Sequence, residues 1–164
     1  MTRTGTRELA VRLIFSLSEN GHSADEVVDE VLSDDYYPTL FGEDELYKST
    51  PRGEETEYLR RVVTGVASRA AELDERIGKY ALGWQVYRIS RTAVAIMRIA
   101  MFETLYMPEI PPRSALDAAI DLAKKYETQE TASFINGILG AFSREELSIE
   151  TEDEDEAIPK RGGV

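Results

Sequence analysis

Apolar residues recur at helical spacing along nearly the whole chain, and this periodicity constrains the fold more than any other feature. On an α-helix, positions three or four apart share a face, so this spacing predicts a helix with one buried side. The run Leu59, Val62 and Val66 shows the pattern clearly. No segment shows the strict alternation that is typical of half-buried strands. We therefore expect an all-α fold.

Capping residues and helix breakers divide this pattern into separate helices. Thr6, Ser23 and Thr128 are suited to helix N-termini because their side-chain oxygens accept backbone N–H groups. Gly78 and the prolines from Pro108 onward are expected to end helices. The expected helices span residues 6–20, 23–33, 55–77, 79–88, 90–106, 113–126 and 128–145, with Leu82 and Val86 facing inward in the fourth.

Two segments depart from the helical pattern. Residues 34–56 mix aromatic, acidic, Pro and Gly residues without a clear period, so we expect a loop insertion whose aromatics pack back onto the helices. Residues 146–164 are strongly acidic and end in Pro and Gly, which predicts a disordered tail. The expected organisation is one helical domain over residues 1–145, interrupted by the insertion and followed by the tail.

The net charge of −12 taken alone argues against binding to nucleic acid, because phosphates repel an acidic surface. The charge is unevenly distributed, however. Residues 34–58 and residues 145–164 each hold eight acidic and two basic side chains, so the rest of the chain is neutral overall. A local basic patch is therefore compatible with the total, and the first fifteen residues offer one. The charged residues there are Arg3, Arg7, Arg12 and Glu8.

The residue types that most catalytic sites need are scarce. The chain has no cysteine and a single histidine, His22, which excludes thiolate catalysis, cysteine-bound zinc and a histidine cluster. No glycine-rich phosphate loop follows a strand. We expect a protein without cofactor that is not an enzyme, although a metal held by carboxylates alone stays open. The first residues lack an apolar stretch followed by a small-residue cleavage site, and no apolar run approaches about 20 residues. We therefore expect a cytoplasmic protein without a signal peptide that does not enter a membrane.

Two phenylalanines leave the predicted core faces. With about 100° between successive helical residues, Phe15 points about 170° away from the core face of its helix, with Val11 near it. Such a second apolar face is either buried against the 34–56 insertion or offered to a partner. Phe134 lies about 90° from its core face, where an aromatic side chain is either simple core or stacks on unpaired bases. The neighbouring pair Asn136-Gly137 predicts a close helix approach or a local hydrogen bond.

Four segments of the chain carry a resemblance to a known family. They are RELAVRLIFSL (7–17), AIMRIAMFETLY (95–106), PPRSALDAAIDLAKKY (111–126) and FINGILGAF (134–142). Together they resemble the family of NusB-type transcription antitermination factors, and the resemblance covers residues 5–145. The resemblance implies an all-α bundle of two packed subdomains with three to four helices each. It also implies binding to the boxA element of nascent RNA together with NusE, a small-subunit ribosomal protein. The complex joins other Nus factors at RNA polymerase and promotes read-through, notably in ribosomal RNA operons, without catalysis.

The resemblance also assigns RNA-binding residues. The arginine-rich N-terminal segment of the family corresponds to Arg3 and Arg7, although threonine and glycine separate these arginines here. The aromatic residue of the last helix that contacts RNA matches Phe134, and the acidic position four residues earlier matches Glu130. These four residues are the expected RNA contacts.

The expected contact with NusE lies elsewhere. The family's aromatic residue against NusE matches Phe15, beside Val11, and a charged family position falls at Ala93, where Arg91 is the nearest replacement. NusB-like proteins occur as monomers or as homodimers, and a dimer would cover Phe15. The alternative function is a protein–protein adaptor without direct RNA contact, which the apolar face at Phe15 would support on its own. A helical RNA-binding appendage of a methyltransferase fits less well, because the chain has no catalytic domain.

Overall fold

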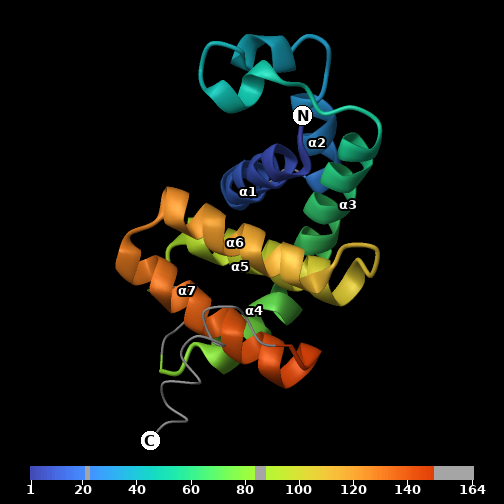
Figure 1. Ribbon diagram of the computed structural model, residues 1–164. Helices are drawn as coiled ribbons and strands as arrows, with labels where there is room; N and C mark the ends of the chain where they lie inside the picture. Colours follow the sequence, from blue (N-terminus) through green and yellow to red (C-terminus); the bar gives the residue numbers. More distant parts are fainter. Residues whose placement is uncertain (21–22, 84–87, 150–164) are drawn as a thin grey trace, which may run out of the picture. The chain divides into compact units, whose positions relative to one another are not determined.

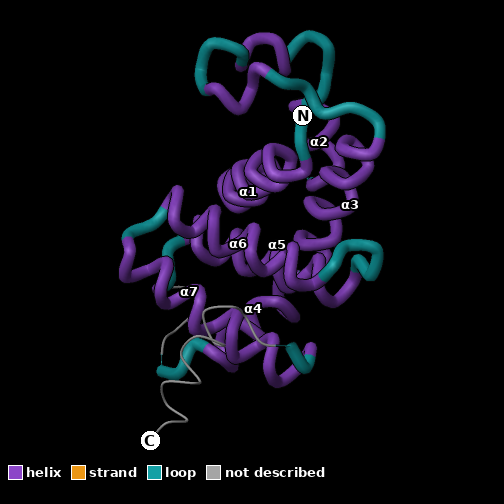
Figure 2. The backbone as a smooth tube through the Cα atoms, in the orientation of Figure 1, coloured by secondary structure: helices purple, strands orange, loops and turns teal. Residues whose placement is uncertain are grey.

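The computed structural model describes residues 1–20, 23–83 and 88–149, which form seven α-helices and no strand (Figures 1 and 2). The prediction of an all-α fold is confirmed. The chain divides into two compact units, Met1–Ala70 and Ala71–Val164, in keeping with the two expected subdomains. His22, Val86 and residues 150–164 of the expected tail lie outside the described residues.

The first unit is built on three helices. They are α1 (Arg3–Asn20), α2 (Ala24–Val31) and α3 (Glu54–Ser68), and both α1 and α2 pack against α3 (Figure 1). Ser23 caps α2 by accepting the backbone N–H of Glu26 at 3.2 Å, as the sequence predicted. Ala10 of α1 and Leu59 of α3, both on predicted apolar faces, are completely buried in the core of this unit.

Helix α1 begins three residues earlier than predicted, because Thr2, and not Thr6, accepts a backbone N–H group of its first turn. The Thr2 hydroxyl oxygen accepts the backbone N–H of Gly5 at 3.0 Å. Thr6 instead donates its own hydroxyl to the Thr2 carbonyl oxygen at 2.8 Å and contacts Glu55 of α3 at 3.2 Å. Both threonines are good caps by residue type, so the sequence alone does not decide between them.

The insertion, expected to be a loop, contains two short 3₁₀ helices, η1 (Tyr37–Leu40) and η2 (Glu45–Lys48). The expected packing of its aromatics is only partly found. Tyr37 is buried against Tyr47 with ring centroids 6.0 Å apart, whereas Tyr36 and Phe41 are exposed. The segment is also tied to α1, where Arg12 binds Asp44 at 3.0 Å and lies over the Tyr47 ring. The insertion is therefore an ordered part of the first unit.

The second unit contains the other helices. They are α4 (Ala70–Tyr80), α5 (Arg91–Tyr106), α6 (Pro112–Tyr126) and α7 (Gln129–Phe142), and α7 runs on into a π-helical turn, η4 (Ser143–Leu147). Helix α6 packs against both α5 and α7, and α5 also contacts α7 (Figure 1). Helix α5 is buried on most sides. Its Arg98 donates two hydrogen bonds to the Asp74 carboxylate of α4, at 2.7 and 2.6 Å.

The expected single helix over residues 55–77 is wrong, because the backbone leaves helical geometry at Arg69, with φ −115° and ψ 16°. Gly78 does not end α4, which continues to Tyr80, since Ile77 and Tyr80 are held in the core on either side. The expected helix over residues 79–88 is not found in the described residues 81–83, which form a turn. Leu82, expected to face inward, is 85% exposed.

The folded part of the chain extends past the expected start of the tail. Glu146, assigned to the tail by sequence, accepts hydrogen bonds from the Tyr80 hydroxyl and from Arg76 Nε, the latter at 2.9 Å. Burial alone would raise the pKa of Glu146, but these hydrogen bonds outweigh burial and lower it. Burial and the same hydrogen bond raise the pKa of Tyr80 to about 12. Residues 143–147 are thus anchored to α4.

Candidate functional site

The four expected RNA-binding residues divide between the two units. Arg3 and Arg7 lie one turn apart on α1, and Glu130 and Phe134 lie one turn apart on α7. Positions four apart share a helix face, so the two members of each pair lie on the same side of their helix.

The two arginines are less exposed than the sequence suggested, because Arg3 contacts side chains of α3 and Arg7 is buried. The Arg3 guanidinium lies 4.3 Å from the centre of the Tyr58 ring, and its Nε is 3.5 Å from a Glu55 carboxylate oxygen. Its side chain is still 35% exposed. Arg7 is only 7% exposed, so its charge is held inside the first unit. Arg3 is thus the more exposed arginine of this pair. The sequence could not show this, because Glu55 and Tyr58 are distant along the chain.

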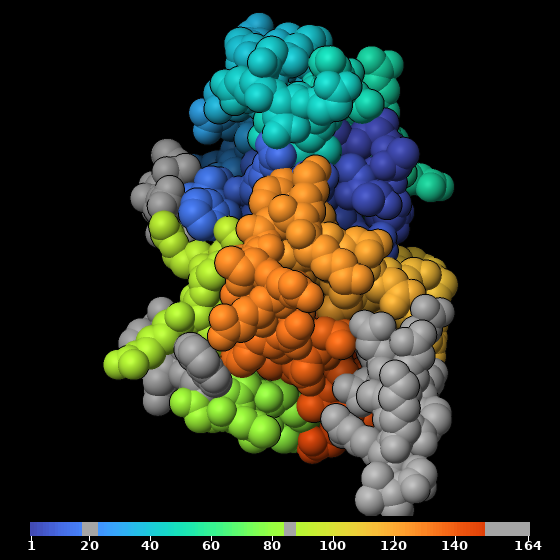
Figure 3. Space-filling model, turned by 60° about the vertical axis from the view of Figure 1, so that its left-hand side comes forward, coloured from blue at the N-terminus to red at the C-terminus, as the bar shows by residue number. Residues whose placement is uncertain are grey.

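Helix α7 begins at the predicted cap and has Phe134 at the predicted edge of its core face. Thr128 caps the helix by accepting the Thr131 N–H at 3.1 Å, and Glu130 is exposed in the first turn, where the helix dipole favours a carboxylate. Phe134 is half-buried at the edge of the core face. Side chains of α6 and α7 form part of the surface of the second unit (Figure 3). An edge aromatic with a partly exposed ring is suited to stacking on a planar ligand.

Two of the expected partner contacts are wrong in detail. Val11 is 2% exposed and Ala93 is 0% exposed, so neither side chain offers surface to a partner. Ala93 is buried because α5 is apolar on nearly all sides, and Val11 is buried because both apolar faces of α1 are covered at that point. Phe15 is half-buried and Arg91 is exposed, so these two remain available for contact.

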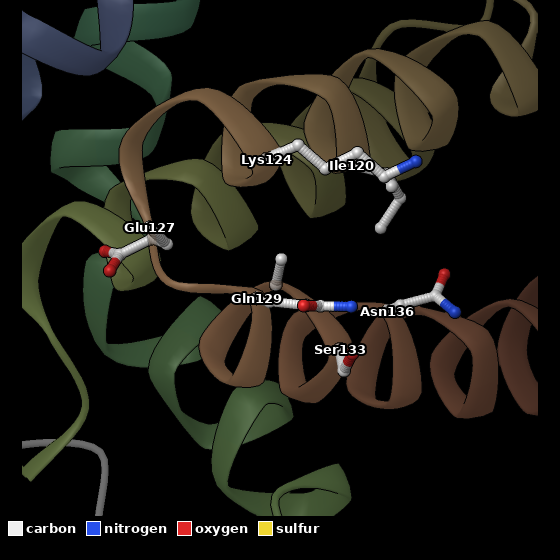
Figure 4. Close-up of a pocket in the computed structure, with 7 residues that line it drawn as sticks. Ile120, Lys124, Glu127, Gln129, Ser133 and Asn136 are labelled. Atoms are coloured by element: carbon white, nitrogen blue, oxygen red, sulfur yellow. The ribbon is translucent and has the colours of Figure 1, made fainter.

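A groove between α6 and α7 was missed by the sequence prediction. It has a volume of about 390 Å³, an apolar part formed by Ile120 and Ala132, and polar walls (Figure 4). Figure 4 shows Ile120 and Asn136 pointing into the space between the two helices. The only signal in the sequence was the helical spacing of polar residues along α7, which did not reveal what faces them. The polar lining residues are Lys124, Glu127, Gln129, Ser133 and Asn136.

The pair Asn136-Gly137 does not serve the packing that the sequence suggested. Gly137 is exposed, and a Cβ atom at this position would meet nothing within 4 Å. The expected close helix approach at Gly137 is therefore wrong. The Asn136 Oδ1 atom is buried without a hydrogen-bond partner among the described residues, so the expected local hydrogen bond is not found at this atom. Neither residue has a structural explanation within the second unit.

Residues 1–20, 23–83 and 88–149 contain no group of three or more His, Asp or Glu side chains placed to hold a metal ion. Within these ranges, every helix is too short or too polar to cross a membrane.

Comparison with known proteins assigns the chain to a family. The model of the NusB family matches residues 4–144. The chain belongs to the NusB family. Among its relatives, the transcription antitermination protein NusB of Clostridium botulinum (strain Kyoto / Type A2) is 33% identical over 141 residues, which cover 85% of this chain and 98% of the relative.

Two solved structures show the same fold. NusB from T. maritima superimposes with a TM-score of 0.71 at 24% identity, covering 95% of this chain and 98% of that chain. A protein chain from the crystal structure of a plectonemic RNA supercoil also gives 0.71, at 21% identity, covering 90% and 99%. The NusB fold therefore extends over nearly all of the chain, including both compact units.

Proposed function

We propose that this protein is a transcription antitermination factor that binds boxA RNA together with the ribosomal protein NusE. In this role it joins other Nus factors at RNA polymerase and promotes read-through, notably in ribosomal RNA operons. The family match over residues 4–144 supports the proposal, as do relatives that are named transcription antitermination proteins. The protein acts by binding, without cofactor or catalysis, in the cytoplasm.

The observation that carries the RNA role is the position of Phe134. Its side chain is half-buried at the edge of the core face of α7, one turn from the exposed Glu130. A rigidly held aromatic ring stacks on an unpaired base at little entropic cost. Arg3, whose side chain is 35% exposed, adds a phosphate contact. The acidic residues that dominate the net charge lie mainly in other segments.

Phe15 and Arg91 are the proposed contacts with NusE. Phe15 supplies an apolar anchor on α1, and Arg91 supplies an exposed charge at the start of α5. An aromatic side chain and an arginine are the residue types most enriched at the energetic centres of protein interfaces. In this proposal the partner supplies part of the RNA-binding surface, so the pair binds RNA more tightly than this chain does alone.

Titration of fluorescently labelled boxA RNA with and without NusE tests the proposal. We expect tighter binding in the presence of NusE, and a loss of roughly tenfold for Phe134→Ala, because one base stack contributes about 1–3 kcal/mol. The control is Phe41→Ala, which removes an exposed aromatic ring from the insertion in the first unit. Equal affinity with and without NusE, or equal losses for the two variants, would count against the proposal.

The adaptor alternative gains support from one observation, the contact of Arg3 with Glu55 and Tyr58. An adaptor without RNA contact predicts that Arg3→Glu leaves antitermination in a reporter assay unchanged. The RNA-binding proposal predicts that this variant weakens read-through and lowers the salt dependence of RNA binding, because one phosphate contact is lost.

A further inference from the structure

The groove between α6 and α7 holds polar side chains whose hydrogen-bonding capacity is unused by the fold. In the described part of the chain, the side chains of Lys124, Gln129 and Ser133 form no hydrogen bond or ion pair. Glu127 differs, because it accepts a hydrogen bond from Ser90 at the start of α5. Figure 4 shows Lys124 extending along α6 and Gln129 along α7 toward the end of the groove where Asn136 lies.

Asn136 is the strongest sign that this groove has a ligand. Its Oδ1 atom is buried without a partner in the described structure, and exchanging the amide oxygen and nitrogen would still leave a polar atom at this position. Buried polar atoms are nearly always hydrogen-bonded in native proteins, so an unpaired one needs an external explanation. A ligand in the groove that reaches this amide supplies the missing partner.

The chemistry of the lining residues fits a nucleotide. Side-chain amides present a donor and an acceptor side by side, which matches the hydrogen-bonding edge of a base, and an ammonium group matches a phosphate. Ile120 and Ala132 provide an apolar surface for the base, and about 390 Å³ falls within the range of small-ligand sites. We propose that the α6–α7 groove binds one unpaired nucleotide of the RNA strand. The amides of Asn136 and Gln129 contact the base, and Lys124 contacts the phosphate. This inference rests on the proposed RNA-binding function.

Gly137 connects the groove with Phe134. With about 100° between successive residues, Gly137 lies between Asn136 and Phe134 around α7. Its position is exposed and carries no side chain, so a strand that leaves the groove can cross the helix backbone closely there. One RNA strand can then place one nucleotide in the groove and stack a neighbouring base on Phe134.

Side-chain amide signals in NMR spectra of the ¹⁵N-labelled chain test the groove directly. We expect boxA RNA, in the presence of NusE, to shift the side-chain amide signals of Asn136 and Gln129. AMP and UMP are added separately to learn whether a free nucleotide suffices. Shifts of these amide signals with AMP or UMP would show that the groove binds a free nucleotide. Shifts with RNA but not with AMP or UMP would show that it binds a nucleotide only as part of a strand, and both results support the proposal. Inorganic phosphate producing the same shifts would overturn the proposal, since a base would then be unnecessary.

Variants provide the second measurement. We expect Asn136→Ala and Lys124→Ala to weaken boxA binding about fivefold to tenfold. Lys125→Ala is the matched control, because Lys125 neighbours Lys124 but lies over the Tyr126 ring.

Asn136→Ala also distinguishes ligand binding from a structural role, since it removes an unpaired buried atom and should leave the unfolding midpoint equal or higher. If all three variants bind RNA with the same affinity as wild type and the amide signals do not shift, the groove inference is wrong but the proposed function stands. If wild type binds no RNA with or without NusE, the proposed function fails as well.

Discussion

Substitution of Gly137 by alanine should stabilise the protein. In an exposed helix interior, alanine is favoured over glycine by about 1 kcal/mol. Nothing offsets this gain, because the new Cβ atom meets no atom within 4 Å. For a chain of 164 residues, about 1 kcal/mol corresponds to a rise in Tm of roughly 2–4 °C.

Urea denaturation followed by circular dichroism measures this change, and Gly53→Ala is the matched control. A Cβ at Gly53 also meets nothing within 4 Å, but its φ of +56° is costly for other residues, so this variant should lose about 1 kcal/mol. A decrease in stability for Gly137→Ala would refute the conclusion that no packing requires this glycine. The same variant should weaken boxA binding, since its methyl group blocks the close approach of the strand.

Two further predictions concern the second unit. Asp74→Asn should lower the free energy of unfolding by about 1–2 kcal/mol in urea titrations, because it weakens the charge-assisted hydrogen bonds with Arg98. For Glu146, hydrogen bonds from Tyr80 and Arg76 outweigh burial and lower the folded-state pKa below 4.5, so its ionised form stabilises the fold above that pH. This stability is lost as the pH falls through the lowered pKa. Glu146→Gln should therefore be less stable than wild type at pH 7, and its free energy of unfolding should fall less steeply between about pH 5 and pH 3. An equally steep fall for the variant and wild type would contradict the anchoring of η4 by Glu146.

The sequence predicted the helices well and their interruptions poorly. Ser23, Ser90 and Thr128 cap helices where the local pattern placed helix starts, because a cap is a local hydrogen bond. The break at Arg69 is different, because arginine is a good helix former and the apolar period continues past it. The division into two units at this point is a tertiary effect, which a single-helix pattern does not contain.

At the candidate site, too, the sequence predicted local helix geometry but not tertiary packing. The position of Phe134 at the edge of α7 follows from helix geometry and was predicted. The burial of Val11 and Arg7 depends on which elements cover α1, so sequence spacing could not reveal it. The α6–α7 groove likewise needs two helices in register, and only the structure places Lys124 opposite Asn136.

Photocrosslinking tests most directly whether RNA lies on α7. BoxA RNA carrying 4-thiouridine would be irradiated with the chain and NusE, and crosslinked peptides would be identified by mass spectrometry after trypsin digestion. Because no Lys or Arg lies between Lys125 and Arg144, one peptide, residues 126–144, contains all of α7. We predict crosslinks in this peptide, reduced by Phe134→Ala. Crosslinks confined to other peptides would contradict the placement of RNA on this helix.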